Sequence, residues 1–214
     1  MESSIAQVRD YLTELQKSIT SALEEEEGRA SWSTDEWVYE GGGGGKSCII
    51  EEGETFEKGG VNFSHVMGAS LPPAATKERQ ELAGAAFEAM GVSLVMHPRN
   101  PMAPISHANV RLFDAKPEGR PAVWWCGGGF DLTPCYGIEE DAVHWHTVAK
   151  QACEPFGEGV YAECKKWCDT YFYLKHRSHC RGVGGLFFDD WNRWDFGKCF
   201  AFMKSVGDHY IPAY

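Results

Sequence analysis

The sequence lacks any apolar run long enough to cross a bilayer, which argues against a helical membrane-spanning protein. It also lacks an excess of positive charge, because its formal net charge at pH 7 is -11. This balance argues against nucleic acid or an anionic membrane surface as the main partner, although a local cluster of arginines can still bind an anionic small molecule. The first residues lack the basic start and apolar core of a signal peptide. We therefore predict a cytoplasmic protein.

Patterns typical of metal sites are scarce as well. None of the cysteines stands in a CxxC pair, and Cys164 and Cys168, four residues apart, are too few for zinc by themselves. We predict reduced thiols, most of them buried. The histidines show none of the HxE, HxxE or HxD spacings of a two-histidine, one-carboxylate iron site. His144 and His146 do not share a helix face, so we do not expect them to bind one ion together.

The sequence does contain enough apolar material for a packed core, with 43% hydrophobic and 13% aromatic residues. We expect residues 1–214 to form a single domain. Apolar periodicity predicts helices at 1–28, 76–90, 138–153, 161–177 and 195–210, and strands at 31–39, 47–52, 61–67, 92–97, 108–113, 122–125 and 182–188. Strands that come in runs, with most helices late in the chain, predict the α+β class with an antiparallel sheet.

The glycine run at 41–45 is interpreted as a hairpin tip. Lys46 and Ser47 follow it, as in a phosphate-binding loop. The spacing does not match that motif, because Glu40 stands where its first glycine belongs.

Three polar side chains, His107, Asn109 and Arg111, alternate along a predicted strand. Residues two apart on a strand face the same side of the sheet. An imidazole, an amide and a guanidinium on one face could hold a carboxylate and move a proton. From spacing alone, a solvated sheet face explains the same pattern at least as well.

Residues 124–134 combine two tryptophans, three glycines and Asp131. Glycine in a strand lets another backbone or a ligand come close. Asp131 lies among apolar neighbours, so as a carboxylate it needs an arginine or several N–H donors as partners. A turn aspartate near Pro134 is the alternative interpretation.

Basic residues gather at 176–181, after a predicted aromatic helix. Arg177 and Arg181 would form a two-pronged anion site if that helix extends so far, but attraction to a helix C-terminus explains them too. The adjacent acids Asp189 and Asp190 are interpreted as turn or cap residues.

From Phe87 to Phe188 the chain closely resembles the oxygen-dependent coproporphyrinogen III oxidase family. The motifs that carry the resemblance are MGVSLVMHPRNP, SHANVRLF, VWWCGGGFDLTP, EEDAVHWH, KKWCDTYFYLKHR and RGVGGLFFDD. The resemblance weakens toward both ends but covers nearly the whole chain. It implies a large antiparallel sheet flanked by helices on both faces, and a homodimer. It also implies oxidative decarboxylation of two propionates of coproporphyrinogen III by molecular oxygen, without an organic cofactor.

The resemblance also implies roles for individual residues. It assigns catalysis to His107 and Asp131. It assigns substrate contact to Ser93, Asn109, Val110, Arg111, Arg177 and Arg181. It further suggests a divalent metal bound by His97, His107, His146 and His176, as in bacterial members, although metal dependence differs across the family.

Members of that family continue past a segment like HYIPAY, so the resemblance implies that a C-terminal part with a glycine-rich substrate loop and much of the dimer contact is missing from this chain. Two other functions stay open from the sequence. One is tetrapyrrole binding without catalysis, and the other is a histidine-ligated metal oxygenase.

Overall fold

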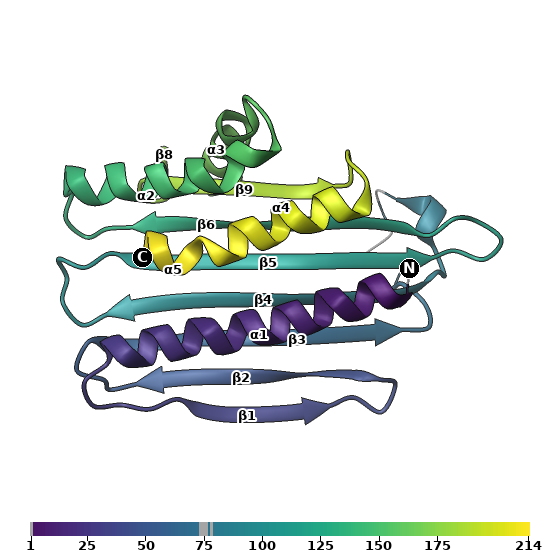
Figure 1. The fold of residues 1–214 in the computed structure, drawn as a ribbon, viewed down its shortest axis with the longest axis horizontal. Coiled ribbons are helices and arrows are strands. Elements are labelled where there is room, and N and C mark those ends of the chain that lie inside the picture. Colours follow the sequence, from purple (N-terminus) through teal and green to yellow (C-terminus); the bar gives the residue numbers. More distant parts are fainter. Residues whose placement is uncertain (1, 73–76, 78) are drawn as a thin grey trace.

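A seven-stranded antiparallel sheet forms the centre of the computed structural model, which describes residues 2–72, 77 and 79–214. The strands lie in the order β1-β2-β3-β4-β5-β6-β9 (Figure 1). Their bounds are β1 Ser33–Val38, β2 Gly43–Glu51, β3 Phe56–Gly68, β4 Ala86–Pro98, β5 Ile105–Lys116, β6 Val123–Thr133 and β9 Gly184–Trp191. Each strand through β5 pairs with the next in sequence to form an antiparallel meander, so the predicted antiparallel sheet and the α+β class are confirmed.

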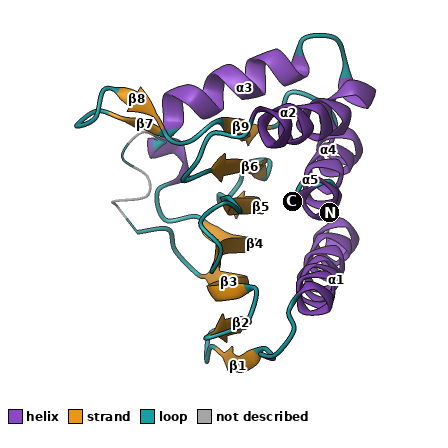
Figure 2. Cartoon of the chain, turned by 90° about the vertical axis from the view of Figure 1, so that its left-hand side faces the viewer, coloured by secondary structure: helices purple, strands orange, loops and turns teal. Residues whose placement is uncertain are grey.

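The long helices lie mainly on one face of this sheet. Figure 2 shows α1, α2, α4 and α5 on one side, while α3 runs along the edge at β9. Their bounds are α1 Glu2–Glu26, α2 Glu139–Cys153, α3 Val160–Tyr171, α4 Phe196–Asp208 and α5 Tyr210–Ala213, with short 3₁₀ turns at η2 Gln80–Leu82 and η3 Glu154–Phe156. We call this the covered face and the opposite side the open face. A small hairpin, β7 Tyr173–Leu174 and β8 His179–Cys180, lies on the open side.

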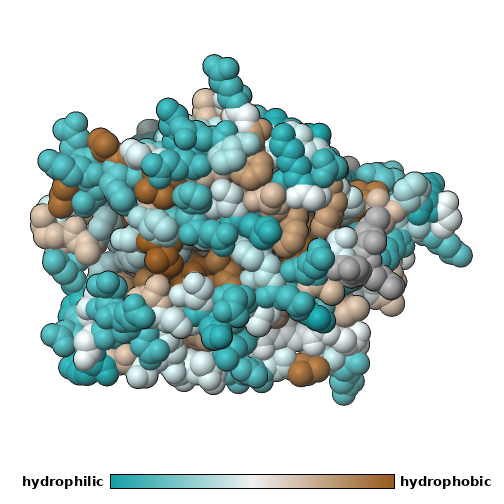
Figure 3. Space-filling model, viewed as in Figure 1, coloured by the Kyte–Doolittle hydropathy of each residue, from teal (hydrophilic) through white to brown (hydrophobic). Residues whose placement is uncertain are grey.

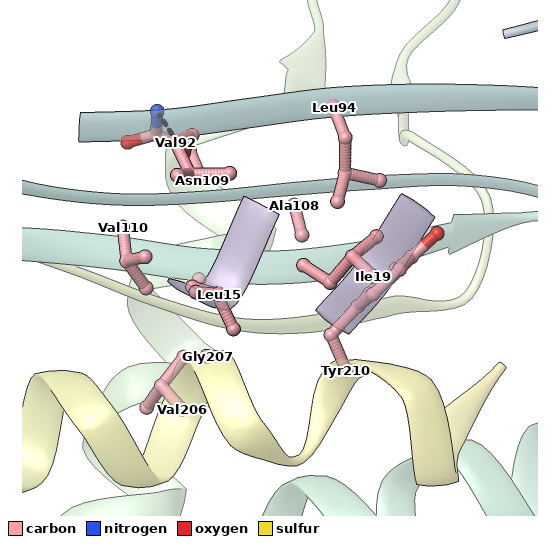
Figure 4. A pocket seen from close by; sticks show the side chains of 11 residues that line it. Leu15, Ile19, Val92, Leu94, Ala108, Asn109, Val110, Val206, Gly207 and Tyr210 are labelled. Carbon is pink, nitrogen blue, oxygen red and sulfur yellow. Dashed lines mark hydrogen bonds between the residues drawn. The ribbon is translucent and has the colours of Figure 1, made fainter. Parts of the chain in front are cut away.

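The core lies between the covered face and these helices. The helix predicted at 1–28 from apolar periodicity is confirmed as α1, and its periodic apolar residues are all buried there: Ile5, Val8, Leu12, Leu15, Ile19 and Leu23. The gap left between α1, α4 and the sheet holds about 10 Å³ (Figure 4), which is no more than a water occupies. Figure 3 shows apolar side chains on this side in a hollow between α1 and α5, lined among others by Leu23, Phe56, Ile211 and Tyr214.

The predicted helix at 76–90 is wrong. Thr76 lies outside the described residues, Gln80–Leu82 forms only a 3₁₀ turn, and Ala86 begins β4. The spacing of Leu82, Ala86 and Met90 imitates a helical stripe. Strand pairing prevails there, because residues 86–90 gain ladder partners in β5 and nearly all of them in β3 as well.

The predicted helix at 161–177 ends early, at Tyr171. The strands are also longer than predicted. Part of the glycine run belongs to β2, because Trp37 crosses directly over Gly45, where an added Cβ would lie 2.2 Å from the Trp37 ring. Only residues 39–42 form the predicted hairpin turn. All eight cysteines are free thiols, and most are buried, as predicted.

Among the residues described above, no helix has the length and apolar character that crossing a bilayer requires.

Candidate active site

The polar side chains predicted to share a sheet face do share the open face. The register pairs His107 with Asp131, Asn109 with Gly129 and Ser93 with Asn109 across β4, β5 and β6. His107, Asn109 and Arg111 all line one pocket of about 240 Å³. The predicted common orientation of these three is therefore confirmed.

An aromatic wall closes the other side of this pocket. It consists of Tyr171 and Phe172 at the end of α3 and Phe187 of β9. Tyr171 stacks on Phe187 with ring centroids 4.1 Å apart, and Phe172 meets the Phe187 ring edge at 5.6 Å. The early end of α3 therefore brings its last aromatic residues over the polar strands. The result is a pocket with a polar floor and an apolar wall, which is the usual composition of a small-molecule site.

Asp131 forms the most buried polar cluster of the site. Its side chain is 2% exposed, and Arg181 binds it with two hydrogen bonds, Nε to Oδ2 at 2.8 Å and Nη2 to Oδ1 at 2.6 Å. His107 Nδ1 lies 2.8 Å from the same Oδ1. The predicted need of Asp131 for an arginine partner is therefore confirmed. An ionised Asp131 accepts a hydrogen bond from His107 Nδ1, which leaves Nε2 to exchange protons with a ligand.

Apolar groups pack against the inner part of this cluster. Cys168 of α3 is fully buried next to Asp131, and burial, with the Asp131 charge, raises the pKa of its thiol to about 12. Phe172 covers Arg181, whose guanidinium carbon lies 3.8 Å from the ring centroid. Since His107 lines the pocket while Asp131 lies behind it, a bound ligand meets the imidazole first.

Arg111 is held differently, by Asp189 and Asn109. Its Nη2 lies 2.8 Å from Asp189 Oδ2, and its Nη1 donates to Asn109 Oδ1 at 2.6 Å. The glycines of β6 make room for this pair, because a Cβ on Gly127 would lie 2.6 Å from Asp189 Oδ1 and 2.9 Å from Arg111 Nε. Gly129 likewise admits β9, since its Cβ would lie 2.2 Å from the Leu186 carbonyl oxygen.

Three residues that the resemblance assigned to substrate contact do not line the pocket, and one of them, Arg181, binds Asp131 behind it. Val110 points to the covered face and is 4% exposed in the core. Arg177 is exposed in the β7–β8 turn, so it does not continue a helix toward Arg181, and the predicted two-pronged arrangement on one helix is wrong. The backbone changes course after Tyr171 and returns through the short hairpin, which carries Arg181 but not Arg177 back to Asp131.

The four histidines assigned to a metal do not form one site in this chain. His97 lies at the end of β4, His107 binds Asp131, and His176 is exposed in the hairpin turn. His146 has both ring nitrogens engaged, with the Val183 carbonyl at 3.0 Å and the Tyr161 hydroxyl at 2.9 Å, and burial lowers its pKa. Within residues 2–72, 77 and 79–214 no three His, Cys, Asp or Glu side chains gather as metal ligands. The residues present therefore do not fit a shared four-histidine centre.

Sequence reasoning missed Asp189 and the aromatic wall. Asp189 was interpreted as a turn or cap residue, but it is the partner of Arg111. Tyr171 and Phe172 fall in the predicted helix at 161–177 and Phe187 in the predicted strand at 182–188, with no role in a site. One signal could have suggested this ion pair: Asp189 directly follows the aromatic residues of a predicted strand, and Arg111 on another strand has no acidic residue two positions away on the same face.

Fold and site together define an α+β protein whose open sheet face can bind a carboxylate-bearing ligand and transfer a proton. Residues 7–214 match the family described as coproporphyrinogen III oxidase. The chain therefore belongs to the coproporphyrinogen III oxidase family, whose members act in haem biosynthesis. The resemblance seen in its motifs is confirmed at this level.

Proposed function

We propose that this chain carries out the oxygen-dependent reaction of its family. Each of two propionates of coproporphyrinogen III, –CH₂CH₂COOH, would react with one O₂ to give a vinyl group, CO₂ and H₂O₂, with protoporphyrinogen IX as the product. The observation that carries the proposal is the His107–Asp131–Arg181 cluster beside the pocket, because it supplies an acid–base group. Arg111, which can bind a carboxylate, lies on the same face of the sheet.

His107 is proposed to move the proton. Asp131 fixes the imidazole through Nδ1, while Arg181 holds the Asp131 side chain in place with two hydrogen bonds. Asp131 is therefore proposed to act through His107 and not by direct contact with the pyrrole N–H groups. The reason is that His107 lines the pocket, whereas Asp131 lies behind it.

Arg111 is proposed to bind a propionate through its planar fork, which a lysine could not reproduce. Ser93 and Asn109 would contribute hydrogen bonds from the pocket floor. Tyr171, Phe172 and Phe187 would exclude water from the reacting side chain. The proposed reaction needs no organic cofactor. Three further points remain predictions: substrate contact by Arg177, assembly as a homodimer, and a cytoplasmic location.

The test is to add coproporphyrinogen III anaerobically to the purified protein and then admit air, with the porphyrin products resolved by chromatography. We expect protoporphyrin above the no-enzyme control only after oxygen enters, with one O₂ consumed per propionate lost. Equal turnover without oxygen would contradict the oxygen dependence. A His107→Ala variant that retains full turnover would contradict the role of the imidazole.

A further inference from the structure

Two adjacent aspartates of β9 hold two arginines at the edge of the open face. The β6–β9 register shifts between Cys126 and Gly128, so Asp189 and Asp190 together lie opposite Gly127. Asp190 has a positive φ of 47°. Such a bulge overrides the alternation of side chains and lets neighbouring residues point to one side. Asp189 binds Arg111, and Asp190 Oδ1 lies 2.9 Å from Arg79 Nη2.

Arg79 is held over the sheet by more than this ion pair. Its guanidinium carbon lies 4.2 Å from the centroid of the Trp125 ring, and Trp125 stacks on Phe113 at 4.2 Å. The turn that follows Arg79 is anchored by Leu82, which is 1% exposed in a small second core. The position of the Arg79 side chain is thus set by an aromatic platform and a buried anchor.

Arg79 and Arg111 stand next to each other along the strand direction. Phe113 and Trp125 pair across β5 and β6, as Arg111 and Gly127 do, and the two pairs are two residues apart on the same face. Two residues along a strand span about 7 Å. The open face therefore carries a row that begins at His107, continues with Arg111 and reaches Arg79.

Both of these ion pairs can exchange partners. Arg111 and Asp189 side chains are 32% and 33% exposed, and those of Arg79 and Asp190 are 32% and 55% exposed, whereas Asp131 is 2% exposed. Ion pairs in contact with solvent contribute little to stability. A carboxylate of a ligand offers the same fork geometry as an aspartate, so it can replace Asp189 or Asp190 at little cost.

The size of the pocket indicates that a ligand extends toward this row. At about 240 Å³ the pocket is smaller than the roughly 300–1,000 Å³ typical of drug-sized ligands. A tetrapyrrole cannot fit inside it and must extend over the open face. A tetrapyrrole with four propionates places carboxylates well away from the one that reacts.

We infer that Arg79 and Arg111 form a two-arginine site for propionates remote from the reacting one, and that Asp189 and Asp190 occupy this site when no substrate is bound. The inference rests on the proposed function and adds Arg79 as a substrate-binding residue. Asp190 is then a resident competitor of the substrate carboxylate. The inference therefore predicts that loss of Arg79 weakens substrate binding, whereas loss of the Asp190 charge strengthens it.

The experiment measures binding of coproporphyrin III, the stable oxidised tetra-acid, by quenching of tryptophan fluorescence. We expect Arg79→Gln to weaken binding about tenfold, since one charge-assisted fork is lost. Asp190→Asn should strengthen binding by about two- to fivefold, because it removes the competitor and a like charge. Arg79→Lys should fall between wild type and Arg79→Gln. Arg120→Gln, the same charge change at an exposed site of the β5–β6 turn, is the matched control and should not alter binding.

If Arg79→Gln and Asp190→Asn both weaken binding, the Arg79–Asp190 ion pair only holds the turn that follows Arg79 in place, and the inference is overturned. An Arg79→Gln variant that binds like wild type overturns it as well. Should Arg79→Gln not fold, the sign of the Asp190→Asn effect decides alone. Wild-type protein that does not bind coproporphyrin III would instead overturn the proposed function, and the inference with it.

Discussion

On β5, Ala108 and Val110 point to the long helices and are 8% and 4% exposed, while their neighbours His107 and Asn109 point to the open face and line the pocket. The same alternation thus serves two purposes on one strand. The covered face gains free energy from the burial of apolar area. The open face holds polar groups in fixed positions, because the strands that carry them are anchored from behind.

The two faces also differ in how they treat charge. On the open face, Asp131 is buried but has Arg181 and His107 as partners. On the covered face, Asp114 is 2% exposed, and neither of its carboxylate oxygens has a hydrogen-bond partner among the described residues, although Lys116 Nζ lies 3.8 Å from Oδ2. A buried charge with hydrogen-bonded partners suits a working site, whereas a buried charge without hydrogen-bond donors costs stability. Substitutions on each face can test this difference.

The largest effect is expected at Asp131. Asp131→Asn should lower kcat by about 10²–10⁴-fold, because the amide cannot stabilise a charged His107. The fold should persist, since the Arg181 side chain is 34% exposed and can be hydrated. Turnover of coproporphyrinogen III and near-UV circular dichroism measure the two properties. Asp35→Asn, on an exposed strand of the same sheet, is the control, and an active Asp131→Asn variant would refute the assignment.

Adjacent residues of β4 give the next test. Leu94 is 2% exposed on the covered face, and Val95 is 39% exposed on the open face. Leu94→Ala should lower the free energy of unfolding by about 2–5 kcal/mol, because it removes buried methyl groups and leaves a cavity. Val95→Ala should cost less than about 1 kcal/mol. Urea unfolding measures both, and equal losses would mean that the two faces do not differ in packing.

Most of the sheet could be predicted from the sequence, because its strands alternate clearly and follow one another. His107, Asn109 and Arg111 were found for the same reason, as residues two apart on a strand. The false helix at 76–90 arose where Leu82, Ala86 and Met90 fit a helical period by chance. Their strand pairing depends on partners in β3 and β5, which a local pattern does not contain.

The rest of the site depends on contacts between distant parts of the chain. Arg181 meets Asp131 across 50 residues, and nothing in its local sequence distinguishes it from Arg177. Asp189 reaches Arg111 only because a bulge shifts the register of β9. Register shifts of this kind are set by the pairing of whole strands, so the adjacent acids were assigned to a turn.

A smaller effect is expected where the backbone makes room for the open-face arginine. Gly127→Ala would place a methyl group 2.6 Å from Asp189 Oδ1 and 2.9 Å from Arg111 Nε. Displacing Arg111 should raise KM about tenfold, with a smaller change in kcat. Steady-state kinetics measure the split. Gly137→Ala, with nothing within 4 Å of the added Cβ, should leave both constants as they are. An unchanged KM in Gly127→Ala would mean that Arg111 does not bind substrate.

The smallest effect is expected at Asp114, the carboxylate of the covered face that lacks hydrogen-bond donors among the described residues. Burial, and secondarily the nearby Glu88 charge, raise the Asp114 pKa, while Lys116 opposes the shift. A carboxyl group whose pKa is raised on folding destabilises the folded protein as pH rises through that pKa, and this penalty is absent below the unfolded value of about 4. Asp114→Asn should therefore stabilise the protein by about 1 kcal/mol at pH 7 and by less near pH 4. Thermal unfolding at the two pH values measures the difference.

Glu27 is the matched contrast for Asp114. Glu27 is 8% exposed, but its carboxylate accepts hydrogen bonds from the backbone N–H groups of Arg29, Ala30, Glu54, Thr55 and Phe56. Burial alone would raise its pKa, yet these donors lower it to about 2. The stability that they provide is present above the unfolded pKa and is lost as pH falls toward 2. Glu27→Gln should thus destabilise the protein at pH 7, opposite in sign to Asp114→Asn. If both substitutions shift the unfolding temperature in the same direction, hydrogen-bond partners do not decide whether this fold tolerates a buried carboxylate.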